Sequence, residues 1–98
     1  MAPRERKTHQ VKSWCHLYGP FSRGEKTHDL RVLDRDYQVG DILVLLEYDK
    51  FREQYTGRAT KAEITYITSE QHTACAFSPT ALDANYGILS IRKIDDEA

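Results

Sequence analysis

Polar and apolar residues alternate along several short stretches of this 98-residue chain, which is the pattern of half-buried β-strands. The alternation predicts strands over Thr8–Trp14, 27–33 and 59–68, and a final strand over Tyr86–Ile94. Residues 42–48 are almost all apolar and β-prone, which is typical of a strand buried on both faces. We therefore expect about five strands, with 42–48 as the central one.

The segments between these strands carry turn signals and one weak helix signal. Residues 15–23 contain apolar side chains, but the Gly19-Pro20 pair limits them to a short or broken helical turn, because proline lacks an N–H. Turns are predicted at 34–36 and 39–41, just before the apolar strand.

A charged hairpin loop is predicted over 49–58, and 69–84 is irregular with a candidate short helix at 80–83. Together with the absence of a repeating βα pattern, this predicts an α+β, mostly β domain. We expect a small barrel of about five strands with one or two short helices.

Alternation also assigns side chains to the two faces of a strand. In 59–68 it groups Ala62, Ile64 and Tyr66 against Glu63, Thr65 and Ile67. Over 26–31 it groups Thr27, Asp29 and Arg31 against Lys26, His28 and Leu30. Asp29 and Arg31 are therefore expected to form a salt bridge.

Composition indicates one folded domain, since 40% of the residues are hydrophobic and six are tyrosines. We expect the domain to span 8–94, between a flexible basic N-terminus at 1–7 and an acidic tail at 95–98. An apolar run near 18 residues and a secretory signal are both missing, which predicts a cytoplasmic protein without membrane contact. We also expect a monomer. Cys15 and Cys75 are expected to be reduced thiols.

The net charge of −1 bears on the choice of partner, because dedicated nucleic-acid binders are commonly basic. Any such binding must come from a local patch. Residues 22–41 hold the densest charge in the chain, and two glycines lie among them. The charged residues of this stretch include Arg23, Lys26, Asp29, Arg31, Asp34, Arg35 and Asp36.

Within this stretch, G-E-K-T-H-D-L-R at 24–31 resembles the G-x-K-x-x-E-x-R signature of ASCH domains, small members of the PUA-like superfold. D-R-D-Y-Q-V-G-D-I-L and Y-T-G-R resemble one ASCH-related group of uncharacterised prokaryotic and phage proteins, DUF3850. The resemblance covers about 8–94 and implies a small PUA-like β-barrel. It also implies that Lys26, Asp29 and Arg31 line a cleft proposed to hold RNA, with Asp29 where the family usually has Glu.

The leading functional hypothesis is a module that binds single-stranded or looped RNA, or a nucleoside-like ligand. Lys26, Arg31 and Arg35 would contact phosphates or base edges, and Asp29 would accept a hydrogen bond from a base or ribose. Arg58 is expected on a turn, and its planar guanidinium suits phosphates and carboxylates. Tyr37 and Tyr55 flank glycine turns, where an aromatic ring can stack on a base.

Two other functions stay open. A bacterial group in the same superfamily resembles this chain at G-x-K-T and hydrolyses the amide of acylated cytidines, so Lys26, Thr27 and Asp29 would be the catalytic candidates. Asp29 stands where that group has its threonine nucleophile, which favours binding over hydrolysis. The other alternative is a protein-interaction accessory factor of phage or mobile-element origin.

Metal and cofactor chemistry lack a sequence signal. The four histidines stand singly and do not have zinc-ligand spacing, and neither a P-loop nor a dinucleotide-binding glycine motif is present. We expect no metal and no cofactor.

Overall fold

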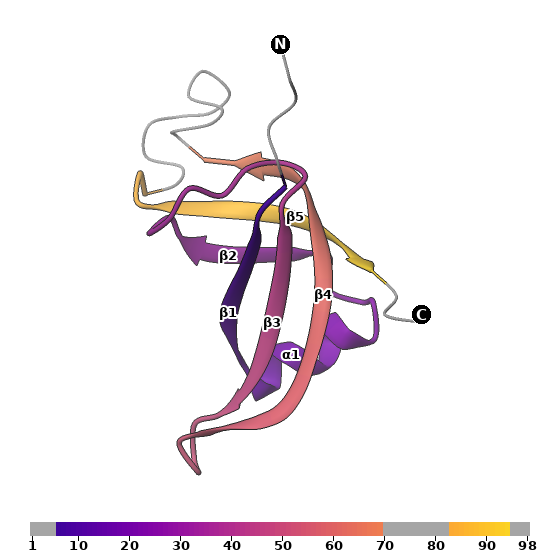
Figure 1. The fold of residues 1–98 in the computed structure, drawn as a ribbon. Helices are drawn as coiled ribbons and strands as arrows, with labels where there is room; N and C mark the ends of the chain where they lie inside the picture. Colours follow the sequence, from indigo (N-terminus) through magenta and orange to yellow (C-terminus); the bar gives the residue numbers. More distant parts are fainter. Residues whose placement is uncertain (1–5, 70–82, 95–98) are drawn as a thin grey trace.

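A computed structural model describes residues 6–69 and 83–94 of the chain (Figure 1). In chain order its elements are β1 (Thr8–Trp14), α1 (Cys15–Ser22), β2 (His28–Val32), β3 (Ile42–Asp49), β4 (Gln54–Thr68) and β5 (Tyr86–Ile94). The five strands form one mixed sheet in the order β1-β3-β4-β5-β2, in which only the β1–β3 pair is parallel. The predicted mostly-β fold is confirmed.

The sheet curls strongly into a half-barrel. In Figure 1, β1, β3 and the first part of β4 run side by side, while β5 and β2 cross the upper part of the molecule. The long strand β4 bends between the two directions and pairs with both β3 and β5. The curl places the two edge strands, β1 and β2, on the open side of the half-barrel.

Strands β1 and β5 have the bounds that alternation predicts. In β1, His9, Val11 and Ser13 are buried and the residues between them are exposed. In a strand with one buried face, buried and exposed residues alternate with a period of two. The bounds of β1 and β5 can therefore be predicted from their own sequences.

Helix α1 corrects the expectation of a short or broken turn, because it runs for eight residues with Pro20 inside it. Tyr18 and Phe21 are buried on the helix face that packs against the sheet. Burial of these two aromatic side chains offsets the hydrogen bond that proline removes.

Strand β4 differs from two predictions, the loop at 49–58 and the faces assigned to 59–68. It begins at Gln54, so the hairpin loop is much shorter than 49–58, and Gly57 lies in the strand with a φ of 95°. A register shift between Ile64 and Tyr66 then reverses the alternation: Ile64 and Ile67 are buried, whereas Tyr66 is exposed. The predicted grouping of Tyr66 with Ile64 is therefore wrong, because a bulge inserts an extra residue and flips the faces.

The hydrophobic core lies on the inner face of the curled sheet. It consists of Val11, Phe21, Tyr37, Leu43, Leu45, Ala62, Ile64, Ile67, Leu89 and Ile91. Strand β3 is paired on both edges, but β4 is the middle strand of the order, so the prediction of 42–48 as the central strand is wrong. Burial on both faces is also incomplete, because Val44 and Leu46 are only half-buried. The candidate helix at 80–83 lies, apart from Asp83, outside the described residues.

The predicted turn before β3 is present, and a buried carboxylate holds it. Asp41 is fully buried and accepts hydrogen bonds from the main-chain N–H groups of Lys7 and Gln38, while its Oδ2 lies 2.8 Å from His9 Nε2. Gly40 supplies the positive φ of 96° in this turn. The contacts tie the start of β1 to the start of β3.

Candidate functional site

Two arginine side chains reach the edge strand β1 on the open side of the half-barrel, Arg31 from β2 and Arg35 from the segment that follows β2. Arg31 Nη2 donates a hydrogen bond to the main-chain oxygen of Lys12, at 3.1 Å. Arg35 Nη1 donates to the main-chain oxygen of Gln10, at 3.4 Å. Since β1 and β2 are the two ends of the sheet order, these side chains stand where a barrel would have its last strand pair.

The residues of the G-x-K-x-x-D-x-R motif converge on one carboxylate. Asp29 is 7% exposed, and its Oδ2 accepts a 2.7 Å hydrogen bond from Arg31 Nε. Its Oδ1 lies 3.7 Å from Lys26 Nζ. The predicted Asp29–Arg31 salt bridge is confirmed.

Lys26 reaches Asp29 although strand alternation places it on the opposite face. The reason is that β2 begins at His28, so Lys26 lies in the preceding turn, where the period of two does not apply. Lys26 also donates a hydrogen bond to the main-chain oxygen of His28. The alternation was extended two residues too far toward the N-terminus.

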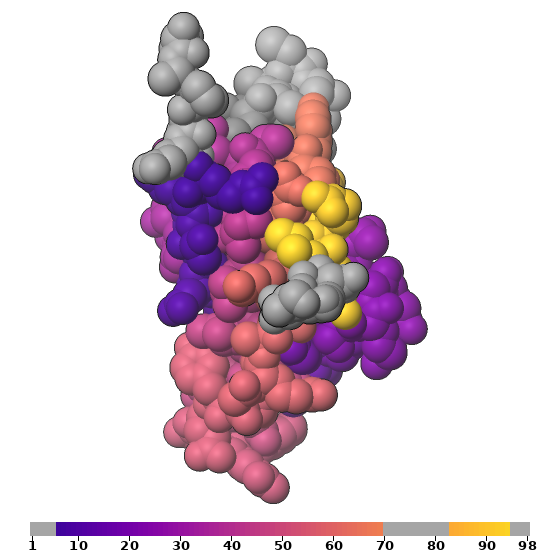
Figure 2. All heavy atoms as spheres, turned by 45° about the vertical axis from the view of Figure 1, so that its right-hand side comes forward, coloured from indigo at the N-terminus to yellow at the C-terminus, as the bar shows by residue number. Residues whose placement is uncertain are grey.

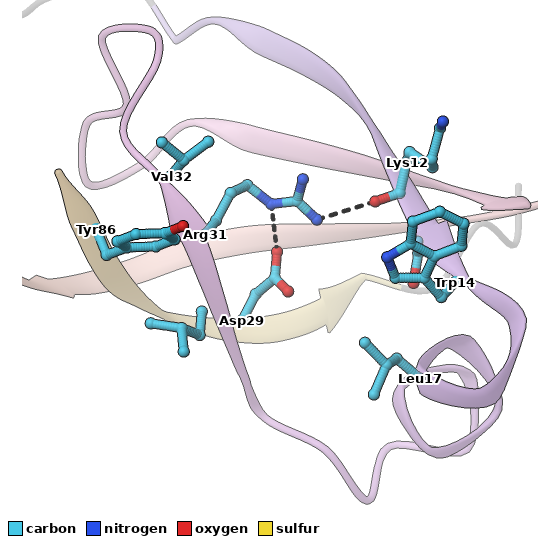
Figure 3. A pocket seen from close by; sticks show the side chains of 9 residues that line it. Lys12, Trp14, Leu17, Asp29, Arg31, Val32 and Tyr86 are labelled. Atoms are coloured by element: carbon cyan, nitrogen blue, oxygen red, sulfur yellow. Dashed lines mark hydrogen bonds and ion pairs between the residues drawn. The ribbon is translucent and has the colours of Figure 1, made fainter.

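A groove of about 310 Å³ opens between β1 and β2, beside this cluster (Figure 3). It is lined by Lys12, Ser13, Trp14, Leu17, Asp29, Leu30, Arg31, Val32 and Tyr86. Figure 3 shows Arg31 between the rings of Trp14 and Tyr86, with its guanidinium directed toward β1. Both rings are partly exposed, Trp14 by 39% and Tyr86 by 43%.

Positive charge predominates at the groove. Lys12 and Arg31 line it together with Asp29, and Lys26, which is not part of the lining, contacts the Asp29 carboxylate. Arg31 uses Nε and Nη2 for its bonds to Asp29 and Lys12, so a guanidinium with five N–H donors still has donors to offer. This arrangement suits an anion or a planar polar group placed between two aromatic rings.

The amino-acid sequence matches a known family over most of its length. The family described as "Domain of unknown function (DUF3850)" matches residues 8–91. The chain belongs to the DUF3850 family. The described groove residues, from Lys12 to Tyr86, all fall within the match.

A phage protein provides a second similarity. The "Uncharacterized 12.9 kDa protein in GpA 3'region" of Escherichia phage P2 is 36% identical over 62 residues. These residues make up 63% of this chain and 55% of the phage protein. The DUF3850 chain therefore spans about half the length of this curated relative.

Tyr37 is buried, which contradicts the prediction that its ring is exposed beside a glycine turn and stacks on a base. Its side chain is 1% exposed and belongs to the core, 4.8 Å from the ring of His9 between centroids. Burial raises the pKa of its phenol above the ordinary value. The ring is enclosed, so it is not available for stacking on a base; tertiary packing covers a residue that the nearby glycine turn had marked as exposed.

Arg58 lies outside the groove lining and is engaged elsewhere. Its guanidinium donates two hydrogen bonds to the buried carboxylate of Glu47, at 2.8 and 3.0 Å, and Thr56 Oγ1 donates a third. These bonds hold the pKa of Glu47 below its ordinary value. Arg58 also lies over the ring of Tyr18, 5.3 Å from its centroid. In this position Arg58 links strand β4 of the DUF3850 domain to Glu47 on β3 and to Tyr18 on α1.

Other predicted site residues lie near the groove or apart from it. Arg35 is exposed and forms one of the two bridges to β1, while Thr27 and His28 are exposed positions within the motif. Tyr55 is 51% exposed but belongs to the β3–β4 hairpin. The Lys26 ammonium contacts two oxygen acceptors, a carbonyl and a carboxylate.

Three groove residues were missed by reasoning from sequence: Lys12, Trp14 and Tyr86. A signal for the first two was present, because Lys12 and Trp14 alternate with the buried face of β1. Tyr86 had no such signal, since its place beside Arg31 depends on the pairing of β5 with β2.

Metal binding and membrane crossing have no support in the described part of this DUF3850 domain. Across 6–69 and 83–94, no three His, Cys, Asp or Glu side chains come together as a metal site. Among the same residues, no helix has the length and apolar character needed to cross a bilayer. Cys15 is a half-buried free thiol, and Cys75 lies outside the described residues.

Proposed function

We propose that the groove of this DUF3850 domain binds single-stranded or looped RNA, or a nucleoside-like ligand, as an ASCH-type member of the PUA-like superfamily would. The main support is the position of the Arg31 guanidinium between the partly exposed rings of Trp14 and Tyr86. Nucleotides combine an anionic phosphate with a flat aromatic base, and the groove offers a partner for each.

Arg31 would be the anion or base-edge contact. Its side chain is already oriented by Asp29 on one side and by the Lys12 carbonyl on the other, so little rotamer freedom is left to lose on binding. The remaining N–H donors suit phosphate oxygens or the acceptor edge of a base. Lys26 would act indirectly, by holding Asp29.

Trp14 and Tyr86 would hold the base. Stacking of a base on an aromatic side chain contributes about 1–3 kcal/mol. A volume near 310 Å³ is at the small end of ligand pockets, which fits one splayed nucleotide and excludes a duplex. Asp29 would accept a hydrogen bond from a base or ribose with its remaining lone pairs.

Trp14 gives a direct assay, because it is the single tryptophan of the chain. Tetrauridylate, uridine and cytidine would be titrated into the protein at low salt while tryptophan fluorescence is followed. We expect saturable quenching as a base stacks on the indole. Tyr86→Ala should weaken the binding about tenfold, in line with the loss of one stacking contact.

Tyr66→Ala is the matched control, since Tyr66 is an exposed tyrosine on β4 that does not line the groove. It should leave the titration unchanged. Unquenched fluorescence with every ligand, or equal effects of the two tyrosine substitutions, would argue against the groove as a nucleotide site. Release of cytidine from acylated cytidine, added to the protein in a separate sample, would instead identify an amide hydrolase.

A further inference from the structure

Three aromatic side chains form a row across neighbouring strands at the lower end of the sheet. Trp14 on β1 is the register partner of Tyr48 on β3, which is also the partner of Tyr55 on β4. The ring centroids are 5.6 Å apart in the first pair and 5.0 Å apart in the second, and both pairs are close to T-shaped. We call these three residues the aromatic row.

The aromatic row lies on the outer face of the sheet. On β3, Leu43, Leu45 and Glu47 are buried on the inner face, so Tyr48 points the other way. Helix α1 packs against the inner side through Phe21. Figure 2 shows the end of the β3–β4 hairpin projecting beyond the rest of the described chain.

Exposure differs along the row. Trp14 is 39% and Tyr55 51% exposed, whereas Tyr48 between them is partly buried. Rows of exposed aromatic side chains on a sheet are a common surface for single-stranded nucleic acids, because each base has a flat face that stacks on a ring. The two exposed ends of the row are two strands apart, about 10 Å, so they can accept different bases.

A cation lies among these rings. Lys12 Nζ is 4.0 Å from the centroid of Tyr48 and 5.4 Å from that of Trp14. Its ammonium can contact the phosphate that links two stacked bases. Lys12 and Trp14 also line the groove, so the groove and the aromatic row form one continuous surface.

We infer that the aromatic row is a second stacking surface for single-stranded RNA, which receives nucleotides adjacent to the one in the groove. This inference rests on the proposed function and extends it from a single nucleotide to a short strand. Tyr55 is the outermost contact, Trp14 joins the two surfaces, and Lys12 supplies the positive charge between them.

Length dependence of binding separates the aromatic row from the groove. Fluorescein-labelled oligouridylates of two, four and eight nucleotides would be bound to the full chain and followed by fluorescence anisotropy. The wild type should bind the octamer more tightly than the dimer. Tyr55→Ala should weaken octamer binding by roughly fivefold to a hundredfold and leave dimer binding unchanged.

Two further variants distinguish stacking from a general change in the hairpin. Tyr55→Phe keeps the ring and should retain the affinity of the wild type for the octamer. Tyr66→Ala removes an exposed tyrosine outside both surfaces and should change neither affinity. A folded amide NMR spectrum of each variant is the condition for comparing them.

The outcomes separate this inference from the proposed function. Two results would contradict the stacking role of the aromatic row and leave the proposed groove site supported. One is a wild type that binds the dimer but binds the octamer no more tightly. The other is a Tyr55→Ala variant whose octamer affinity exceeds its dimer affinity by as much as in the wild type. Equal losses for dimer and octamer in Tyr55→Ala would also contradict this role. Failure of the wild type to bind any of the oligonucleotides would contradict both the proposed function and this inference.

Discussion

Arg31 on β2 and Lys12 on β1 join the two edges of the sheet, through a 3.1 Å hydrogen bond from Arg31 Nη2 to the main-chain oxygen of Lys12. Edge strands normally present unpaired main-chain groups to solvent or to another chain. Here a charged side chain occupies one such acceptor and also lines the groove. The same contact therefore protects the β1 edge and orients the guanidinium proposed to bind a ligand.

We expect strong coupling between Asp29 and Arg31. Arg31→Ala should lower the free energy of unfolding by about 2 kcal/mol, because it removes a charged hydrogen bond from a buried carboxylate. A double-mutant cycle with Asp29→Asn, measured by urea unfolding, should give a coupling of about 1–3 kcal/mol.

The Arg23–Glu25 pair provides a comparison within the same chain. Both of its side chains are more than half exposed, although two hydrogen bonds of 3.1 and 3.0 Å join them. Its cycle should give a clearly smaller coupling, since solvent screens exposed ion pairs. Equal couplings for the two pairs would contradict the buried role assigned to Asp29.

Acid should remove the stabilisation provided by Glu47. Hydrogen bonds from Arg58 and Thr56 lower the pKa of Glu47 below its ordinary value of 4.5. A carboxylate with a lowered pKa stabilises the fold fully above its unfolded pKa and loses that effect as the pH falls through the folded pKa. The advantage of wild type over Glu47→Gln should be largest near neutral pH and shrink progressively below about pH 4.5.

The measurement is a series of urea titrations of both proteins between neutral pH and pH 3. Glu47→Gln keeps the shape of the side chain and cannot ionise. A stability difference that stays constant across the series would mean that Arg58 does not favour the ionised form of Glu47.

Gly87 on β5 leaves little room for a side chain. A Cβ at this position would lie 2.8 Å from Leu33 Cδ2. We expect Gly87→Ala to cost about 1 kcal/mol, at the lower end for overpacking, because a leucine terminus can shift. The cost should fall when Leu33→Ala is introduced as well; an undiminished cost in the double variant would show that Leu33 is not the obstacle.

Lys12 should contribute to the salt dependence of RNA binding. Each phosphate contact to a single strand adds about 0.7 to the slope of log affinity against log salt. Lys12→Ala should reduce the slope measured with the octamer by about that amount. Lys7→Ala, an exposed lysine that does not line the groove, should leave the slope unchanged.

Local pattern and tertiary structure contributed differently to the fold. β1 and β5 follow directly from alternation, because one buried face repeats every second residue. The start of β4 did not, since Gln54 and Tyr55 belong to a strand only through their pairing with β3. The bulge near Tyr66 and the continuation of α1 through Pro20 likewise depend on neighbours distant in sequence.

For the candidate site, the sequence by itself determined the charged motif and the Asp29–Arg31 pair, because residues two apart on a strand share a face. Only the tertiary structure decided what surrounds that pair. The curl of the sheet brings Lys12 and Trp14 to one side of Arg31, and the pairing of β2 with β5 brings Tyr86 to the other. The tertiary structure also buries Tyr37 in the core and pairs Arg58 with Glu47. Both arrangements bring together segments that no local periodicity connects.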